Sequence, residues 1–149
     1  MKARTEVILG LVLLAVLFGV GLFAYQARTR NPLPLFRASV DRDCAPWDGS
    51  AFRISIPLDS GSVIEVSIWR SPDLQAPIKF SFPDPTLSAG EAVLRSRFGS
   101  SEPLTGSITF WRLGADDPLE GDFNFAARGG ERFSGGFKAE WRNRAAYCG

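Results

Sequence analysis

Two cysteines and no histidines limit the chemistry available to this 149-residue chain. Cys44 and Cys148 are too few for a typical four-ligand structural zinc site, and there is no histidine to complete one. Neither cysteine has a nearby basic partner of the kind that cysteine hydrolases use. We therefore predict a disulfide between them, worth roughly 4 to 5 kcal/mol in the chain-entropy model, which persists only in an oxidising compartment. The alternative is two buried free thiols in a cytosolic domain.

The carboxylates give no stronger sign of catalysis. Asp41 and Asp43 form one close pair and Asp116 and Asp117 another, but neither has the spaced acidic loop that supplies calcium with six to eight oxygens. Without histidine, the commonest general base and the Ser-His-Asp arrangement are missing. We therefore predict a protein that is not an enzyme and binds no metal or cofactor. Two acidic residues that meet only in space are the alternative.

Two glycine pairs do not form a phosphate-binding loop, because they lack the P-loop lysine and a strand-to-helix context. Gly129-Gly130 has the composition of a hairpin turn. Gly135-Gly136 lies inside a strand-like run, which predicts a β-bulge or a close approach of another backbone.

Arginines are the charged residues with the clearest binding potential. Five of them fall within or beside strand-like runs and are candidates for contact with lipid head groups or an acidic partner: Arg53, Arg70, Arg95, Arg97 and Arg112. The alternative is that they keep the sheet surface soluble and block edge pairing. Four of the 17 basic residues and one of the 16 acidic residues precede Asn31, which leaves 13 basic and 15 acidic residues after it. This balance argues against a nucleic-acid partner.

The N-terminal quarter predicts a membrane anchor. Val7 to Tyr25 is a run of 19 residues without a charge, and a helix of that length spans roughly 28 Å, close to the thickness of a bilayer core. A cleaved secretory signal is the alternative, but its apolar region is usually shorter and ends in a small-x-small site. Gly10, Ala15 and Gly19 offer small surfaces on which a second membrane helix can pack.

The anchor divides the chain into four parts. Residues 1–6 form a short cytoplasmic N-terminus, 7–25 the transmembrane signal anchor, 26–36 a linker stiffened by Pro32 and Pro34, and 37–149 the domain. Basic residues flank the anchor on both sides, so the positive-inside rule does not decide its orientation. The predicted disulfide places the domain on the periplasmic or extracellular side.

The domain has the period-two pattern of half-buried antiparallel strands. Alternating runs occupy Ala51–Ile56, Val63–Trp69, Ile78–Phe82, Ser107–Trp111, Asp122–Ala126 and Arg132–Trp141. Residues 89–97 favour a strand, with a short helix as the alternative because Ser88 and Glu91 have capping-box spacing. We predict an all-β fold: an antiparallel β-sandwich or small β-barrel of about seven or eight strands, ending in a three-stranded meander.

The last 36 residues of this meander resemble the closing hairpins of small bacterial exported β domains of unknown function. The matching positions are Gly106, Ile108 and Phe110, then Glu120, Gly121, Phe123 and Phe125, then Phe133, Gly135 and Phe137. Many of those domains look like lipoproteins, whereas this chain has no lipidation cysteine after its apolar run. The resemblance implies an envelope β domain and assigns no site.

These features predict a single-pass, membrane-anchored extracytoplasmic β domain. It would act as a non-catalytic accessory or interaction subunit of an envelope protein complex, with membrane lipid and one or more proteins as partners. The alternative is a lipocalin-like or avidin-like barrel that binds a small apolar ligand, with Trp47, Trp69, Trp111 or Trp141 lining the cavity.

Overall fold

The computed structural model describes residues 34–84, 86, 89–142, 146 and 148. Leu33–Gly149 form one compact unit. The predicted cytoplasmic N-terminus, the anchor with Gly10, Ala15 and Gly19, and most of the linker lie outside the described residues. Within the described part of the chain, no helix is long and apolar enough to cross a membrane.

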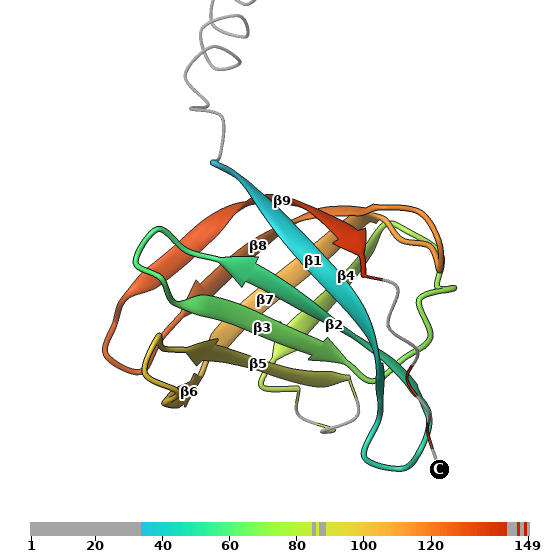
Figure 1. The fold of residues 1–149 in the computed structure, drawn as a ribbon, viewed down its shortest axis with the longest axis horizontal. Coiled ribbons are helices and arrows are strands. Elements are labelled where there is room, and N and C mark those ends of the chain that lie inside the picture. The colour runs from blue at the N-terminus through green and yellow to red at the C-terminus, as the bar shows by residue number, and fades with distance from the viewer. Residues whose placement is uncertain (1–33, 85, 87–88, 143–145, 147, 149) are drawn as a thin grey trace, which may run out of the picture. The chain divides into compact units, whose positions relative to one another are not determined.

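The described residues form an all-β domain, as the sequence predicts (Figure 1). Nine strands follow one another along the chain: β1 (Leu35–Cys44), β2 (Ser50–Pro57), β3 (Val63–Ile68), β4 (Ile78–Phe82), β5 (Gly90–Arg95), β6 (Ser101–Pro103), β7 (Thr105–Arg112), β8 (Leu119–Ala126) and β9 (Arg132–Trp141). The strand interpretation of residues 89–97 is confirmed by β5. The first strand begins at Leu35, inside the range 26–36 that the sequence assigns to the linker.

Alternating side chains produce the strands. In β2, Phe52, Ile54 and Ile56 are fully buried, whereas Arg53 and Ser55 lie on the opposite face. The neighbouring strand β3 repeats this pattern with Ile64, Val66 and Ile68. A strand with one apolar face is stable only when that face is covered, so the pattern requires the sheet to pack against itself or another layer.

All nine strands belong to one sheet, with the order β4-β7-β8-β9-β1-β2-β3-β5-β6. The last three long strands, β7, β8 and β9, pair as the predicted antiparallel meander. The prediction of a wholly antiparallel sheet is wrong at one place, since β1 pairs with β9 in parallel, with Leu35 opposite Gly136 and Val40 opposite Trp141. The two strands are far apart in sequence, so no local pattern sets their relative direction.

The sheet curls until its inner face encloses a single core, as Figure 1 shows. Phe52 of β2 contacts Phe110 of β7, with ring centroids 5.8 Å apart, although β1, β9 and β8 lie between them in the sheet. Phe110 also contacts Phe80 of β4 and Phe137 of β9. The structure is therefore one curled sheet with edge strands β4 and β6, rather than a sandwich of two separate sheets.

Both glycine pairs have structural roles. Gly129-Gly130 lies in the β8–β9 turn, where Ala127 N–H donates to Glu131 O and Gly130 has φ +88°. At Gly135, an added Cβ would lie 2.7 Å from the backbone oxygen of Pro34, so the predicted close approach of another backbone is confirmed. The alternative of a bulge there is wrong, because β9 keeps an unbroken register with β8; the irregularity in this part of the sheet lies between Phe110 and Arg112.

Candidate interaction surface

The loop between β1 and β2 is a tight turn closed by two backbone hydrogen bonds. Ala45 N–H donates to Gly49 O at 2.8 Å, and Asp48 N–H donates to Ala45 O at 2.9 Å. Asp48 has φ +62°, a left-handed conformation that aspartate tolerates better than most residues. These contacts close a tight turn and leave Trp47 at its tip.

Trp47 is 54% exposed but is held in place. Its ring meets Trp69 edge-on, with centroids 5.7 Å apart and an interplanar angle of 84°. The indole also lies over Gly49, where an added Cβ would be 2.7 Å from the indole nitrogen. A fixed, half-exposed tryptophan loses little entropy on binding, which is a property of residues that dominate protein interfaces.

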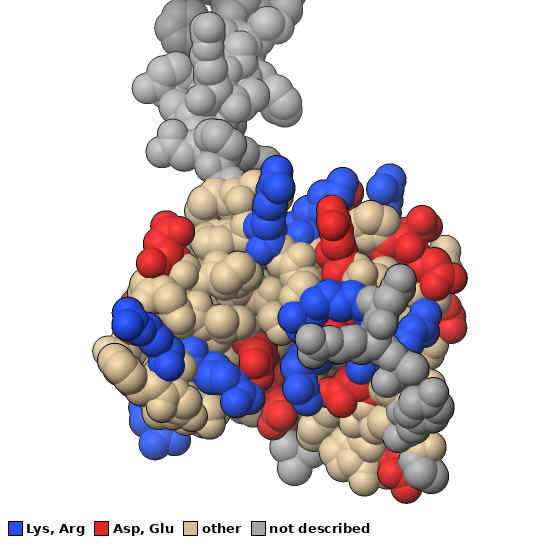
Figure 2. Space-filling model, viewed as in Figure 1, with Lys and Arg blue, Asp and Glu red and all other residues tan. Residues whose placement is uncertain are grey.

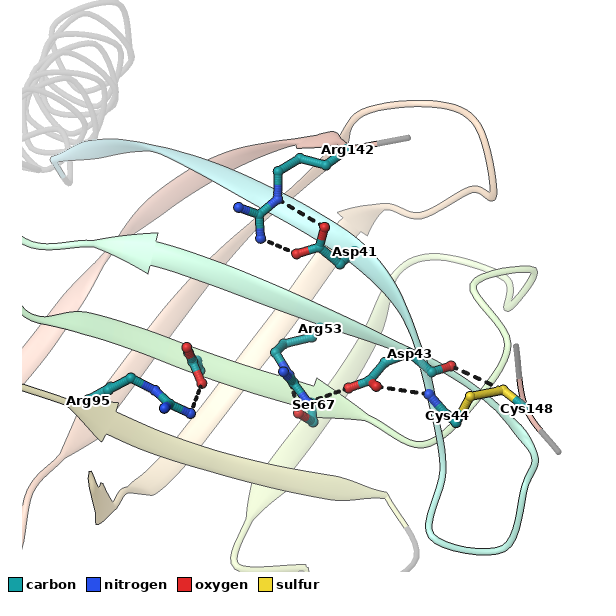
Figure 3. Close-up of polar contacts among 9 residues, drawn as sticks. Asp41, Asp43, Cys44, Arg53, Ser67, Arg95, Arg142 and Cys148 are labelled. Carbon is teal, nitrogen blue, oxygen red and sulfur yellow. Dashed lines mark hydrogen bonds and ion pairs between the residues drawn. A yellow bond between two sulfur atoms is a disulfide. The ribbon is translucent and has the colours of Figure 1, made fainter. Parts of the chain in front are cut away.

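A disulfide fixes the base of this loop. The structure pairs Cys44 with Cys148, as the sequence predicts, with Cα atoms 5.5 Å apart (Figure 3). Cys44 is the last residue of β1, and Cys148 is close to the end of the chain. The C-terminal segment is therefore tied covalently to the strand that leads into the Trp47 turn.

Ion pairs on the outer face of the sheet support the same region (Figure 3). Arg53 on β2 donates to Asp43 Oδ2 at 2.6 Å and to Ser67 Oγ at 3.2 Å, while Asp43 Oδ1 accepts from the N–H of Cys44 at 2.9 Å. This chain of hydrogen bonds links three adjacent strands to the first cysteine. We call the Ala45–Gly49 turn, Trp69 and the Cys44–Cys148 disulfide the disulfide end.

A second pair lies on the same outer face, where Arg142 donates two hydrogen bonds to Asp41. The hydrogen bonds from Arg142 to Asp41 raise the pKa of the guanidinium above its ordinary value. Desolvation of the guanidinium acts in the opposite direction, and the negative charges of Asp41 and Glu65 add to the increase in the pKa. Arg142 directly follows β9, so this contact joins the end of β9 to β1.

A shallow hollow of about 260 Å³ opens beside the disulfide, with Ser71, Asp73 and Cys148 in its wall. Arg42 is also part of its lining and is 3.3 Å from Asp116 Oδ1. Its guanidinium stacks 5.2 Å from the ring centroid of Trp141 and donates to Ala115 O at 3.0 Å. The aromatic groups of the disulfide end therefore lie beside a hollow lined by cationic and hydrogen-bonding groups.

The structure does not gather the five predicted arginines into one cluster. Arg53 pairs with Asp43, Arg95 with Glu65 at 2.8 Å, and Arg112 with Glu120 at 3.7 Å. Arg97 lies in the β5–β6 turn, 5.7 Å from the ring centroid of Phe98, and Arg70 is exposed just after β3. Figure 2 shows basic and acidic side chains interspersed over the face it displays.

The four tryptophans of the ligand-binding alternative do not line one space. Trp47 and Trp69 lie together at the disulfide end. Trp111 is 59% exposed on β7 and donates to Asp122 Oδ2, and Trp141 donates to the carbonyl oxygens of Gly114 and Asp117. The inside of the curled sheet is occupied by large side chains, among them Phe52, Phe110, Phe123, Phe125 and Phe137.

Among the described residues, no group of three or more His, Cys, Asp or Glu side chains is placed to hold a metal ion. The chain matches no known family model, no curated protein and no solved structure.

Sequence reasoning did not find Trp47 as an exposed contact residue, because aromatic residues are buried by default. The local signal was its position in Ala-Pro-Trp-Asp-Gly, a turn-like sequence that directly follows a cysteine.

Proposed function

We propose that this protein is a single-pass, membrane-anchored subunit whose β domain lies outside the cytoplasm. It has no catalytic role and binds a protein partner in an envelope complex. The Cys44–Cys148 disulfide supports an oxidising compartment, and the uncharged run from Val7 to Tyr25 supports an anchor. The partner surface is the disulfide end.

One observation carries the choice of surface: Trp47 is half exposed although its ring is fixed by Trp69, by Gly49 and by a turn closed at a disulfide. Such preorganisation lowers the entropic cost of association and suits a tryptophan anchor in a partner's pocket. The remaining contacts would then come from the polar rim around Arg42 and Asp73.

The location of this surface on the domain fits a protein partner in the aqueous compartment. The chain enters the domain at Leu35 and reaches Cys44 at the other end of β1, which at about 3.3 Å per residue is roughly 30 Å away. A partner at the disulfide end would therefore contact the domain far from the point where the tether joins it.

The test compares two tryptophans of similar exposure in the full chain, Trp47 at 54% and Trp111 at 59%. Wild-type protein, Trp47→Ser and Trp111→Ser are purified from native membranes in mild detergent at native abundance, and each particle is sized and its components identified. We expect wild type and Trp111→Ser to carry the same partner in fixed ratio, and Trp47→Ser to lose it. Release of wild-type protein only as a free monomer would overturn the proposal.

A further inference from the structure

A second surface lies at the opposite end of β1, where the chain enters the domain. A hollow of about 360 Å³ runs along the outer face of the parallel β1–β9 pair, lined in part by Leu35, Arg37 and Lys138. Gly136 lies opposite Leu35 in the register, and an added Cβ there would be 3.6 Å from Leu35 Cδ1. We call the space bounded by the lining residues the entry hollow.

The entry hollow holds two cations side by side. Arg37 and Lys138 are directly opposite each other in the parallel register, and like charges in that position repel. Arg37 is exposed and forms no ion pair within the described residues. Lys138 is 3.5 Å from Glu120 Oε1 and is 49% exposed. Glu140 is the acidic residue in the wall and Glu120 is paired with Lys138, so within the described residues Arg37 is the cation of the hollow that is left without an ion pair and is available to an anionic ligand.

Leu35, the third lining residue named above, indicates the chemical class of the anionic ligand. Leu35 is 73% exposed, an unfavourable state for a leucine beside water. An exposed apolar side chain next to two cations matches the boundary of a phospholipid bilayer. The acyl chains there can contact the apolar side chain, and the phosphates can bind the cations.

The covalent path also places this surface near the membrane. Only eight residues separate Tyr25, the end of the predicted anchor, from Pro34, whose carbonyl accepts a hydrogen bond from Gly136 N–H. Eight residues reach about 30 Å when fully extended. If Val7–Tyr25 spans the bilayer, the entry hollow cannot move further than this from its surface.

We infer that the entry hollow docks on the membrane surface by binding the phosphate of an anionic phospholipid head group. Arg37 and Lys138 contact the phosphate, and Leu35 enters the interfacial layer. The inference rests on the proposed membrane anchor, but it concerns a different surface from the disulfide end.

The chain has three lysines, Lys2, Lys79 and Lys138, which makes amine labelling a direct test. Full-length protein is placed in nanodiscs of phosphatidylcholine alone or of an equal mixture with phosphatidylglycerol. A water-soluble acetylating reagent then labels each lysine, and peptide mapping gives its rate. Lys79 is exposed on the edge strand β4 and serves as the internal control.

We expect phosphatidylglycerol to slow labelling of Lys138 about fivefold and to leave Lys79 unchanged, because one basic residue at an anionic surface contributes about that factor. Arg37→Gln should remove most of the protection of Lys138, whereas Arg70→Gln, beyond β3, should keep it. Equal rates for Lys138 in the two lipids, or equal slowing of both lysines, would overturn the inference while leaving the anchor intact. A chain that does not enter the discs would overturn both proposals.

Discussion

The two ends of β1 present surfaces that are built in opposite ways. At Cys44 the backbone is fixed by a disulfide, a tight turn and the hydrogen bonds of Asp43, and an aromatic side chain projects from it. At Leu35 the surface is a hollow along the parallel β1–β9 pair, with Arg37 and Lys138 in its wall. One strand therefore connects a projecting aromatic surface to a recessed cationic one, and we assign a protein to the first and lipid to the second.

The disulfide should have the largest effect on stability. Replacing Cys44 and Cys148 together by serine removes a cross-link between positions 104 residues apart and should lower the free energy of unfolding by roughly 2 to 5 kcal/mol. Urea titration of both proteins in the same detergent measures the difference. The loss should concentrate at the disulfide end, so that hydrogen exchange rises more in residues 44–50 than in residues 35–40. If hydrogen exchange rises equally at both ends of β1, the disulfide does not stabilise the disulfide end selectively.

Gly135 and Gly136 on β9 lie beside the other end of β1 and allow a test with a smaller and more local effect on stability. Gly135→Ala should lower stability by about 1 to 3 kcal/mol, because its Cβ would lie 2.5 Å from Phe36 and 2.7 Å from Pro34 O. Gly136→Ala is the matched control, since its Cβ would have only ordinary contacts, the nearest at 3.6 Å from Leu35 Cδ1. Its effect should stay within about 0.5 kcal/mol. Equal effects, measured by denaturant titration, would show that Phe36 is not packed tightly across Gly135.

Much of the fold follows from local sequence. Side-chain alternation is a property of the strand itself, so runs such as those around Ile54 and Val66 predict β2 and β3 without knowledge of their neighbours. The pairing of Cys44 with Cys148 followed by elimination, because the chain offers no other partner for a thiol.

The parts that sequence could not supply depend on residues far apart in the chain. The sequence divides the first strand between linker and domain because its inward-facing positions, Phe36, Ala38 and Val40, are a mixed and partly small set, of which Val40 is fully buried. Its parallel pairing with β9 joins Leu35 to Gly136, and no local pattern encodes that contact. The same pairing brings Arg37 beside Lys138, so the entry hollow was not visible among the arginines that the strand pattern singled out.

The sequence predicts which residue types form the candidate site, but not which of these residues lie together. Arginines and tryptophans are the residue types that the sequence singles out for binding, but their grouping depends on the curl of the sheet. Arg53 and Arg95 are on the same outer face, yet each is paired with a carboxylate from a neighbouring strand. Trp47 and Trp69 meet because the β1–β2 turn lies near the end of β3.

The central claim is that an anchored chain carries its disulfide-bonded domain outside the cytoplasm. The most direct test is the intact mass of the protein taken from native membranes after thiols have been trapped with an alkylating reagent. The account predicts one species that retains Val7–Tyr25 and carries no alkyl group. A species with two alkyl groups, or one that lacks the apolar segment, would contradict it.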